Sequence, residues 1–386
     1  MKMNIPILRV PYDESDIRFI KDGIEKVLRS GHLTMNGRVA EFEELFARFC
    51  NTKYAVATNS GTSSIEIALR AIGVEGSSVI VPSNTYMATP IAVVKAGAKV
   101  IFAECQKENF QIDPDDIERK ITPRVKAVIV VHIGGIISPH FDRIKRICQE
   151  NNIFLIEDAA HAHGAVFKNK MAGSLALAGS FSFYPTKVFT TAEGGMLTTD
   201  NEQIYRKAIV LREHGKADHK QNVHVEFGDN WRFSEIHAVL GIRQMAKSEW
   251  ILKQRRNIAR FYDQNLAGLN GISLVKIPDE VISAYYKYMV YIDEAIDRGR
   301  LKQLLKDRYD ICLPGEVYSH PCHSQPVFGK YPEKMDNKKS DSFPVTDYVC
   351  ARHICLPLYP GLTLRELEYI VASLKEAVYE CSRNRG

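Results

Sequence analysis

Short β-branched runs alternate with segments of helical length, and this alternation constrains the fold more than any other feature of the sequence. Five such runs lie at Tyr54–Ala57, Val79–Val81, Lys99–Phe102, Ala127–Val131 and Ile153–Ile156, and two more at Ser180–Phe183 and Met196–Thr199. Strands of this length between helices are typical of a mostly parallel sheet with helices on both faces. The sequence therefore predicts an α/β fold with such a sheet at its centre.

Both ends of the chain carry helical periodicity. Apolar residues three and four apart over Ile17–Leu28 predict an N-terminal helical arm. Near the other end, Thr363 and Glu366 form a capping box in front of a final amphipathic helix. Near residue 250 the alternating strands and helices give way to a polar segment rich in Lys, Arg and Gln. We therefore expect a large domain at 1–250, which includes the arm, and a smaller C-terminal α/β domain at 251–386.

The composition is that of an ordinary globular protein. Hydrophobic residues make up 45% and charged residues 25% of the 386 positions, which excludes a disordered or fibrous chain. The net charge of +5 arises from scattered basic residues, so it indicates no nucleic-acid binding, although it would help to attract a phosphorylated ligand. No apolar run is long enough for a membrane span or a signal peptide. The eight cysteines include no C-x-x-C pair, which favours free thiols and a cytoplasmic protein.

Two motifs follow predicted strands. The turn Asn59–Ser64 precedes a helix, so its backbone N–H groups and hydroxyls offer a phosphate site, although the same turn would serve as an ordinary N-cap. Asp158 stands at the carboxyl end of a buried strand, where open α/β sheets bind ligands. A carboxylate there needs a cationic partner or strong hydrogen bonds. A protonated pyridine nitrogen would be such a cationic partner. The alternative is that Asp158 caps the N-terminus of a helix.

A third motif places Lys187 after the apolar strand Ser180–Phe183. Burial lowers the pKa of a lysine, which suits an amine that acts as nucleophile and base, whereas a lone lysine more often extends to the surface. Lys187 lies 29 residues beyond Asp158. A phosphate cup, a carboxylate for a pyridine nitrogen and an amine that forms a Schiff base are the parts that pyridoxal 5′-phosphate (PLP) requires.

With these motifs in place, the chain resembles the DegT/StrS family of PLP-dependent sugar aminotransferases, which have the fold-type I, aspartate aminotransferase-like architecture. The resemblance covers roughly residues 10 to 380. It rests on five motifs: Asn59-Ser60-Gly61-Thr62, Val81-Pro82-Ser83-Asn84-Thr85-Tyr86, Glu157-Asp158-Ala159-Ala160-His161, Ser182-Phe183-Tyr184-Pro185-Thr186-Lys187 and Gly228-Asp229-Asn230-Trp231-Arg232.

The resemblance implies a role for each residue around the cofactor ring. Lys187 would form the Schiff base, Asp158 would pair with the pyridine nitrogen, and Tyr86 would stack on the ring. His161 stands where Gln is frequent, and it would hydrogen-bond the phenolic oxygen or the ring side of the cofactor.

The resemblance also implies how the phosphate is held. Gly61, Thr62 and Ser182 would bind it, and Asn230 would reach the phosphate of the neighbouring subunit's cofactor. The active site would then be shared, and a homodimer would be the functional minimum.

The substrate contacts follow less directly. His320 and His323 lie in a segment that is near the substrate entrance in the family, and Arg232 is a candidate for the carboxylate of the amino donor. The His and Cys residues at 320–323 and 350–355 are of the types that bind zinc, but their spacing is irregular, so we expect no metal.

The predicted reaction is a ping-pong transamination from glutamate to a nucleotide-linked keto-sugar. The same chemistry on a small phosphorylated ketone or a cyclitol remains open. Family members that are PLP-dependent sugar dehydratases carry His at the lysine position, so Lys187 argues for transamination. The set of Asp158, His161 and Lys187 likewise argues against a non-catalytic PLP-binding regulator.

Overall fold

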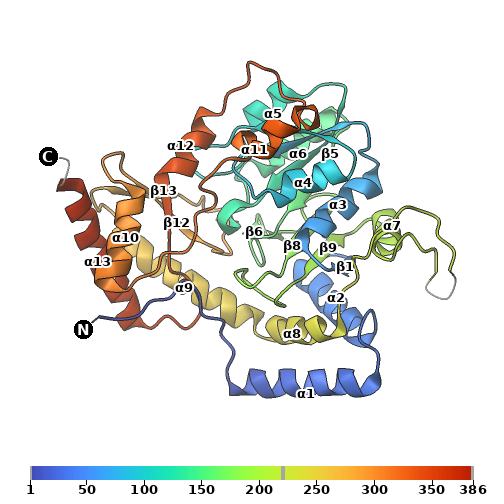
Figure 1. Ribbon diagram of the computed structural model, residues 1–386, viewed down its shortest axis with the longest axis horizontal. Helices are drawn as coiled ribbons and strands as arrows, with labels where there is room; N and C mark the ends of the chain where they lie inside the picture. The colour runs from blue at the N-terminus through green and yellow to red at the C-terminus, as the bar shows by residue number, and fades with distance from the viewer. Residues whose placement is uncertain (1, 219–221, 384–386) are drawn as a thin grey trace.

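A seven-stranded sheet forms the centre of the computed structural model, which describes residues 2–218 and 222–383 (Figure 1). The strand order is β1-β9-β8-β5-β4-β2-β3. Their bounds are β1 (Tyr54–Thr58), β2 (Ser78–Pro82), β3 (Lys99–Ala103), β4 (Val125–Val131), β5 (Phe154–Asp158), β8 (Ala178–Ser182) and β9 (Gly195–Thr199). Strand β9 is antiparallel to both β1 and β8, and the other pairs are parallel. The predicted mostly parallel α/β sheet is confirmed.

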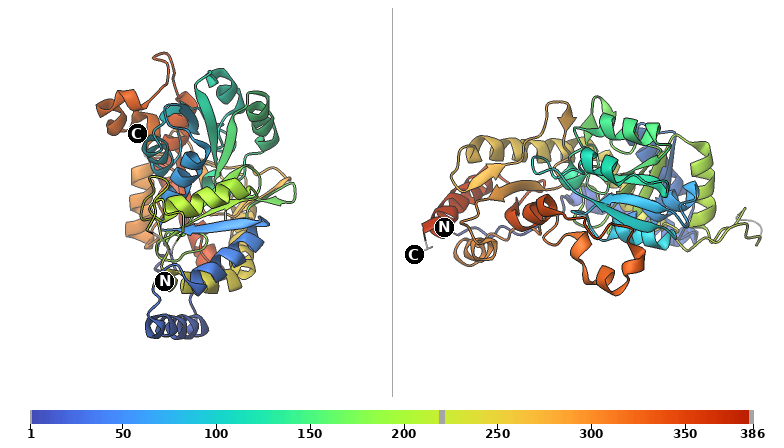
Figure 2. Two further views of the ribbon diagram at one scale, coloured as in Figure 1. Left: turned by 90° about the vertical axis from the view of Figure 1, so that its right-hand side faces the viewer. Right: turned by 90° about the horizontal axis from the view of Figure 1, so that it is seen from above.

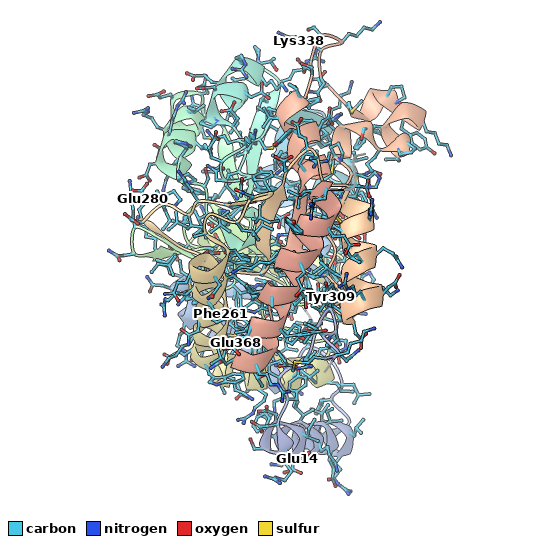
Figure 3. All side chains as sticks on the ribbon, turned by 90° about the vertical axis from the view of Figure 1, so that its left-hand side faces the viewer. Glu14, Phe261, Glu280, Tyr309, Lys338 and Glu368 are labelled. Atoms are coloured by element: carbon cyan, nitrogen blue, oxygen red, sulfur yellow. The ribbon has the colours of Figure 1, made fainter. Side chains whose placement is uncertain are left out.

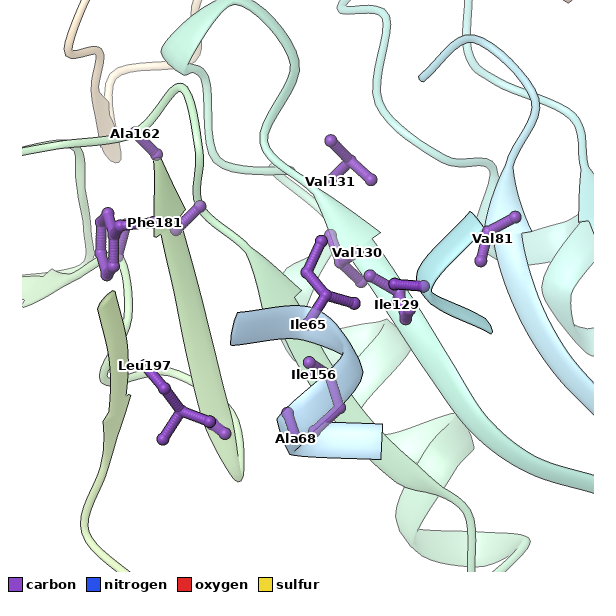
Figure 4. Close-up of a cluster of buried hydrophobic side chains, with 14 of the residues drawn as sticks. Ile65, Ala68, Val81, Ile129, Val130, Val131, Ile156, Ala162, Phe181 and Leu197 are labelled. Atoms are coloured by element: carbon purple, nitrogen blue, oxygen red, sulfur yellow. The ribbon is translucent and has the colours of Figure 1, made fainter. Parts of the chain in front are cut away.

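Helices bury the faces of this sheet, as its nearly continuous apolar strands require. Helix α3 (Gly61–Ile72) packs on β8 and β9 beside α4 (Ala88–Lys95) and α7 (Glu202–Arg212). Ile65 and Ala68 of α3 lie beside Ile156 of the sheet, whereas Phe181 points to the opposite face, where its ring centroid lies 4.9 Å from that of Phe46; all of these residues are almost fully buried (Figure 4). Helices α2 (Gly37–Cys50), α5 (Pro114–Lys120) and α6 (Phe141–Glu150) also pack on the sheet, and α8 (Glu235–Ala246) packs on α2.

A second apolar core lies in the C-terminal part of the chain. The antiparallel sheet β10-β12-β13 packs there with α9, α10 and α13 (Figure 3). Their bounds are β10 (Ile272–Leu274), β12 (Tyr288–Ile292), β13 (His353–Leu356), α9 (Ser248–Leu266), α10 (Arg298–Tyr309) and α13 (Leu364–Arg383). The fully buried Ile5 bridges to Ile311 and belongs to this core. The start of the chain thus packs with its end, and the boundary at residue 250 stays a prediction.

The N-terminal arm is the helix α1 (Glu14–Ser30), which runs along α8 (Figures 1 and 2). Its buried Asp16 pairs with Arg243 and Lys247 at the end of α8. At the other end of the chain, Thr363 and Glu366 exchange the hydrogen bonds of the predicted capping box.

Shorter elements connect these parts. They are η1 (Ile133–Gly135), β6 (Val166–Phe167), β7 (Lys170–Met171), β11 (Val281–Ile282), η2 (Cys322–Ser324), α11 (Pro326–Lys330), η3 (Pro332–Lys334) and α12 (Pro344–Arg352). Within the described ranges, no helix has both the length and the apolar character that crossing a bilayer requires.

Candidate active site

A cavity of about 320 Å³ lies at the carboxyl ends of the parallel strands. Because parallel strands end at the same edge of a sheet, residues distant in sequence meet there. Seven of the eight residues predicted to bind the cofactor line this cavity: Gly61, Thr62, Tyr86, Asp158, His161, Ser182 and Lys187.

One wall of the cavity is the N-terminus of α3. Ser60 caps the helix by accepting the N–H of Ser63 at 3.1 Å, which leaves the N–H groups of Gly61 and Thr62 without a partner inside the helix. A Cβ atom on Gly61 would lie 2.9 Å from the Cβ of Ser182, so glycine allows the end of β8 to approach the helix. The helix terminus and the Ser182 hydroxyl together form a cup suited to a phosphate group.

Asp158 lies at the end of β5 and is 5% exposed. Its Oδ2 accepts a hydrogen bond from Thr89 Oγ1 at 2.7 Å, and its Oδ1 accepts one from the backbone N–H of Ala160 at 3.2 Å. Within the described part of the chain it forms no ion pair. Burial raises the pKa of Asp158, and the bond from Thr89 opposes this rise. A protonated ring nitrogen would supply the cation that this carboxylate lacks.

Lys187 lies in the turn after β8, where its backbone N–H donates to the carbonyl of Tyr184 at 2.9 Å. Its Nζ lies 4.7 Å from the centroid of the Tyr286 ring and, among the described residues, has no hydrogen bond or ion pair. Burial lowers the pKa of Lys187 to about 8, although the charge of Asp158 opposes this shift. A fraction of the molecules therefore carries Lys187 as a neutral amine near physiological pH, the form that attacks a carbonyl group.

Aromatic rings surround the rest of the cavity. Tyr86 is 62% exposed, and its ring centroid lies 5.5 Å from that of Tyr318. His161 stacks on Tyr286 and hydrogen-bonds Tyr318 through Nε2. The sequence reasoning missed Tyr286 and Tyr318. Tyr286 precedes an apolar strand and has the sequence pattern of a residue in the hydrophobic core, whereas Tyr318 lies in a loop-rich stretch without periodicity.

Two predicted residues lie outside the cavity on the segment after α7. Asn230 is exposed, and its backbone carbonyl accepts a hydrogen bond from the side chain of Asn59 at 3.2 Å. Arg232 forms an ion pair with Glu213 at 2.8 Å. The role of Asn230 at a neighbouring subunit's cofactor and that of Arg232 at the donor carboxylate stay predictions.

The two candidate histidines also lie outside the cavity. His323 bonds Ser83 Oγ at 2.7 Å through Nδ1 and stacks on Phe343, whereas the exposed His320 lies 3.0 Å from the hydroxyl of its neighbour Ser319 through Nδ1. Their substrate contacts stay predictions. Across residues 2–218 and 222–383, no group of three His, Cys, Asp or Glu side chains is arranged to hold a metal ion.

The fold and the cavity together define a PLP-dependent transferase of fold-type I. The chain belongs to the DegT/DnrJ/EryC1/StrS aminotransferase family, whose model matches residues 15–375. It is an aminotransferase, and its cofactor is pyridoxal 5′-phosphate. The α3 cup, Asp158 and Lys187 fit the phosphate, the ring nitrogen and the aldehyde of that cofactor.

Several relatives carry specific names. The chain is 31% identical to GDP-perosamine synthase of Caulobacter vibrioides, over 88% of this chain and 90% of that protein. It is also 31% identical to dTDP-3-amino-3,6-dideoxy-alpha-D-galactopyranose transaminase of Aneurinibacillus thermoaerophilus, over 93% of this chain and 95% of the relative. The PLP form of a putative sugar aminotransferase from Streptococcus pneumoniae superposes with a TM-score of 0.88 at 27% identity, covering 98% of this chain and 100% of the other.

Proposed function

We propose that this aminotransferase moves an amino group from glutamate to a nucleotide-linked keto-sugar in a ping-pong reaction. The observation that carries the transamination is the meeting of Lys187, Asp158 and the N-terminus of α3 in one cavity. The keto-sugar is proposed because the relatives named above make GDP- and dTDP-linked amino sugars.

Each residue of the cavity has a distinct task in this reaction. When bound, the cofactor supplies an electron sink that stabilises negative charge at the substrate carbon. Asp158 keeps the ring nitrogen protonated, because its buried carboxylate favours a cationic partner. Lys187 first holds the cofactor and then, as a free amine with a lowered pKa, carries a proton away from or back to the reacting carbon. The α3 terminus fixes the phosphate and thereby the orientation of the ring.

The proposal includes a homodimer with shared sites. Asn230 follows a projecting segment on which Val225 and Phe227 are 62% and 88% exposed. Exposed apolar side chains close together are typical of a protein–protein contact. A second copy that covers this segment would bring Asn230 toward the other subunit's cofactor, as the family resemblance implies.

The test separates the two half-reactions. The purified yellow protein is mixed with glutamate alone, and 2-oxoglutarate together with loss of the yellow colour is the expected result. GDP-, dTDP- and UDP-linked keto-sugars, a small phosphorylated ketone and a keto-cyclitol are then offered, and the amine product is identified by mass. An amine formed only from the small ketones, or loss of water from the sugar without amination, would contradict the proposal.

A further inference from the structure

Both ring nitrogens of His161 have hydrogen-bond partners inside the protein. Nδ1 accepts the backbone N–H of Gly134 at 3.4 Å, and Nε2 lies 3.0 Å from the hydroxyl oxygen of Tyr318. The residue is 3% exposed, and its ring stacks on Tyr286 with the centroids 4.1 Å apart. A bond from His161 to the phenolic oxygen of the cofactor would therefore compete with the bond to Tyr318.

The protonation state of His161 follows from these contacts. Burial lowers the pKa of His161 well below its ordinary range, and the nearby charges of Lys187 and Lys287 lower it further, so the ring is neutral at physiological pH. Nδ1 accepts a hydrogen bond, so the single ring proton lies on Nε2. His161 therefore donates, and the Tyr318 oxygen accepts.

The hydroxyl of Tyr318 is left with a proton of its own. Burial raises the pKa of Tyr318 well above its ordinary value, so the phenol stays protonated. Within the described residues, His161 is the only hydrogen-bond partner of this hydroxyl. A phenolic oxygen that accepts on one side directs its proton to the other, and Tyr318 lines the same cavity as Lys187.

The segment that carries Tyr318 is fixed on both sides. The N–H of Val317 donates to Nε2 of the fully buried His353 at 3.0 Å. Beyond Tyr318, the N–H of Cys322 donates to the carbonyl of Ser83 at 2.7 Å. The hydroxyl is thus held on an anchored loop, as a hydrogen-bond donor that acts without rearrangement must be.

We propose that Tyr318 is a catalytic residue whose O–H hydrogen-bonds the oxygen of the reacting ketone, and that His161 is the residue that positions it. The inference rests on the proposed transamination. In the second half-reaction, the amine nitrogen that the bound cofactor holds would bond to the ketone carbon, and the π pair of the carbonyl would move onto its oxygen. The Tyr318 O–H stabilises this charge. The oxygen then leaves as water, with the two hydrogens that the nitrogen loses.

The same donor acts in the first half-reaction, where water adds and the 2-oxo acid leaves by the reverse sequence. Removal of the α-hydrogen of glutamate does not involve this oxygen, because Lys187 takes that proton. The proposal therefore separates two measurable events: exchange of the α-hydrogen with solvent, and release of 2-oxoglutarate.

The experiment compares Tyr318→Phe with the wild-type holoenzyme in D₂O. We expect 2-oxoglutarate release to fall on the order of 100-fold, as for loss of one oxyanion donor. Exchange of the glutamate α-hydrogen, followed by NMR, should stay within about threefold of wild type, and PLP affinity and the visible spectrum should not change. Equal losses of exchange and release, or a shifted spectrum, would show instead that Tyr318 contacts the cofactor and would overturn the proposal.

Variants of His161 test its positioning role. His161→Gln retains an N–H near the Nε2 position and should release 2-oxoglutarate at close to the wild-type rate, whereas His161→Leu should lose about as much as Tyr318→Phe. The double variant His161→Leu/Tyr318→Phe should lose no more than either single change, and multiplied losses would contradict the coupling.

Two controls separate these results from other failures. Tyr331→Phe changes an exposed tyrosine outside the cavity and should leave both rates unchanged. If the wild-type protein neither exchanges the α-hydrogen of glutamate nor releases 2-oxoglutarate, the proposed function fails. A defect confined to the variants concerns Tyr318 alone.

Discussion

The side-chain nitrogens of Lys187 and Lys287 lie over the same aromatic ring, 4.7 and 5.2 Å from the centroid of Tyr286. In the part of the chain that the structure describes, neither nitrogen has an ion pair. Two cations so near one another disfavour each other's charge. The charge of Lys287 therefore adds to burial in lowering the pKa of Lys187, against the opposing charge of Asp158.

The first prediction concerns the pH at which Lys187 reacts. With a pKa of about 8, its amine loses the proton as the pH rises through that value. The rate at which cofactor-free protein recombines with PLP should therefore rise with pH around a midpoint near 8. An ordinary lysine would give a midpoint of about 10.4. Stopped-flow absorbance measures the rate, and a midpoint near the ordinary value would contradict the lowered pKa.

Replacing the second lysine should move this midpoint. Lys287→Met removes a positive charge and should raise the midpoint by about half a unit, the size expected for one partly screened neighbouring charge. Lys287→Arg keeps the charge and should leave the midpoint close to wild type. The matched control is Lys276→Met. Lys276 is exposed, and together with Lys287 it lines a second pocket, separate from the cavity of Lys187. A shift as large in this control would show that the effect is not specific to Lys287.

The buried carboxylate is the next target. Asp158→Asn keeps the shape of the side chain but removes the charge that holds the ring nitrogen protonated. The rate of α-hydrogen exchange of glutamate should fall on the order of 100-fold. Thr89→Val removes the hydrogen bond to Oδ2, together with the bond between the hydroxyls of Thr89 and Thr85, but leaves the carboxylate in place and should have a much smaller effect. Thermal melts of both variants would show whether the fold is retained, and an exchange rate unaffected by Asp158→Asn would reject its pairing with the ring.

The exposed segment that carries Phe227 tests the proposed dimer. Phe227 is 88% exposed, and Phe227→Asp should weaken dimerisation at least about tenfold in sedimentation experiments, because a charge would be buried at the contact. PLP should also dissociate faster, since Asn230 follows on the same segment. Tyr379→Asp makes the same kind of change at a 61% exposed tyrosine on α13 and serves as the control. A monomeric wild-type protein that retains PLP would refute the shared site.

The sequence predicted the sheet and the residues at its strand ends because both depend on local patterns. Asp158 directly follows a buried run, and Lys187 follows β8 by only a few residues, so their meeting at one edge follows from parallel strands alone. The final helix was likewise predictable, because Thr363 and Glu366 are a local capping signal.

The remaining features of the site depend on contacts between distant segments. Tyr318 reaches His161 across 157 positions, and no periodicity marks its loop. The hydrogen bond between His323 and Ser83 likewise joins residues 240 positions apart, and no local pattern in the sequence indicates it. The packing of Ile5 with the C-terminal core was equally invisible, since a single isoleucine carries no pattern.

The close approach of Gly135 to His161 and Tyr286 allows this long-range contact to be tested through the stability of the fold. Gly135 follows β4 with a φ of +91°, and a Cβ there would lie 2.8 Å from the carbonyl oxygen of His161 and 3.0 Å from the backbone nitrogen of Tyr286. Gly361 has nearly the same φ, +92°, but open space around the position of a Cβ. An alanine would therefore strain the backbone equally at both sites, but only at position 135 would it also clash with neighbouring atoms.

We expect Gly361→Ala to lower the free energy of unfolding by about 1 kcal/mol, the cost of a left-handed alanine. Gly135→Ala adds a backbone clash and should lower it by at least about 3 kcal/mol. It should also slow 2-oxoglutarate release, because the clash displaces His161 and with it Tyr318. Urea unfolding followed by fluorescence gives both free energies. Equal losses of unfolding free energy in the two variants would mean that the backbone near Gly135 shifts to make room for the methyl group. The fold would then not depend on its close approach to His161.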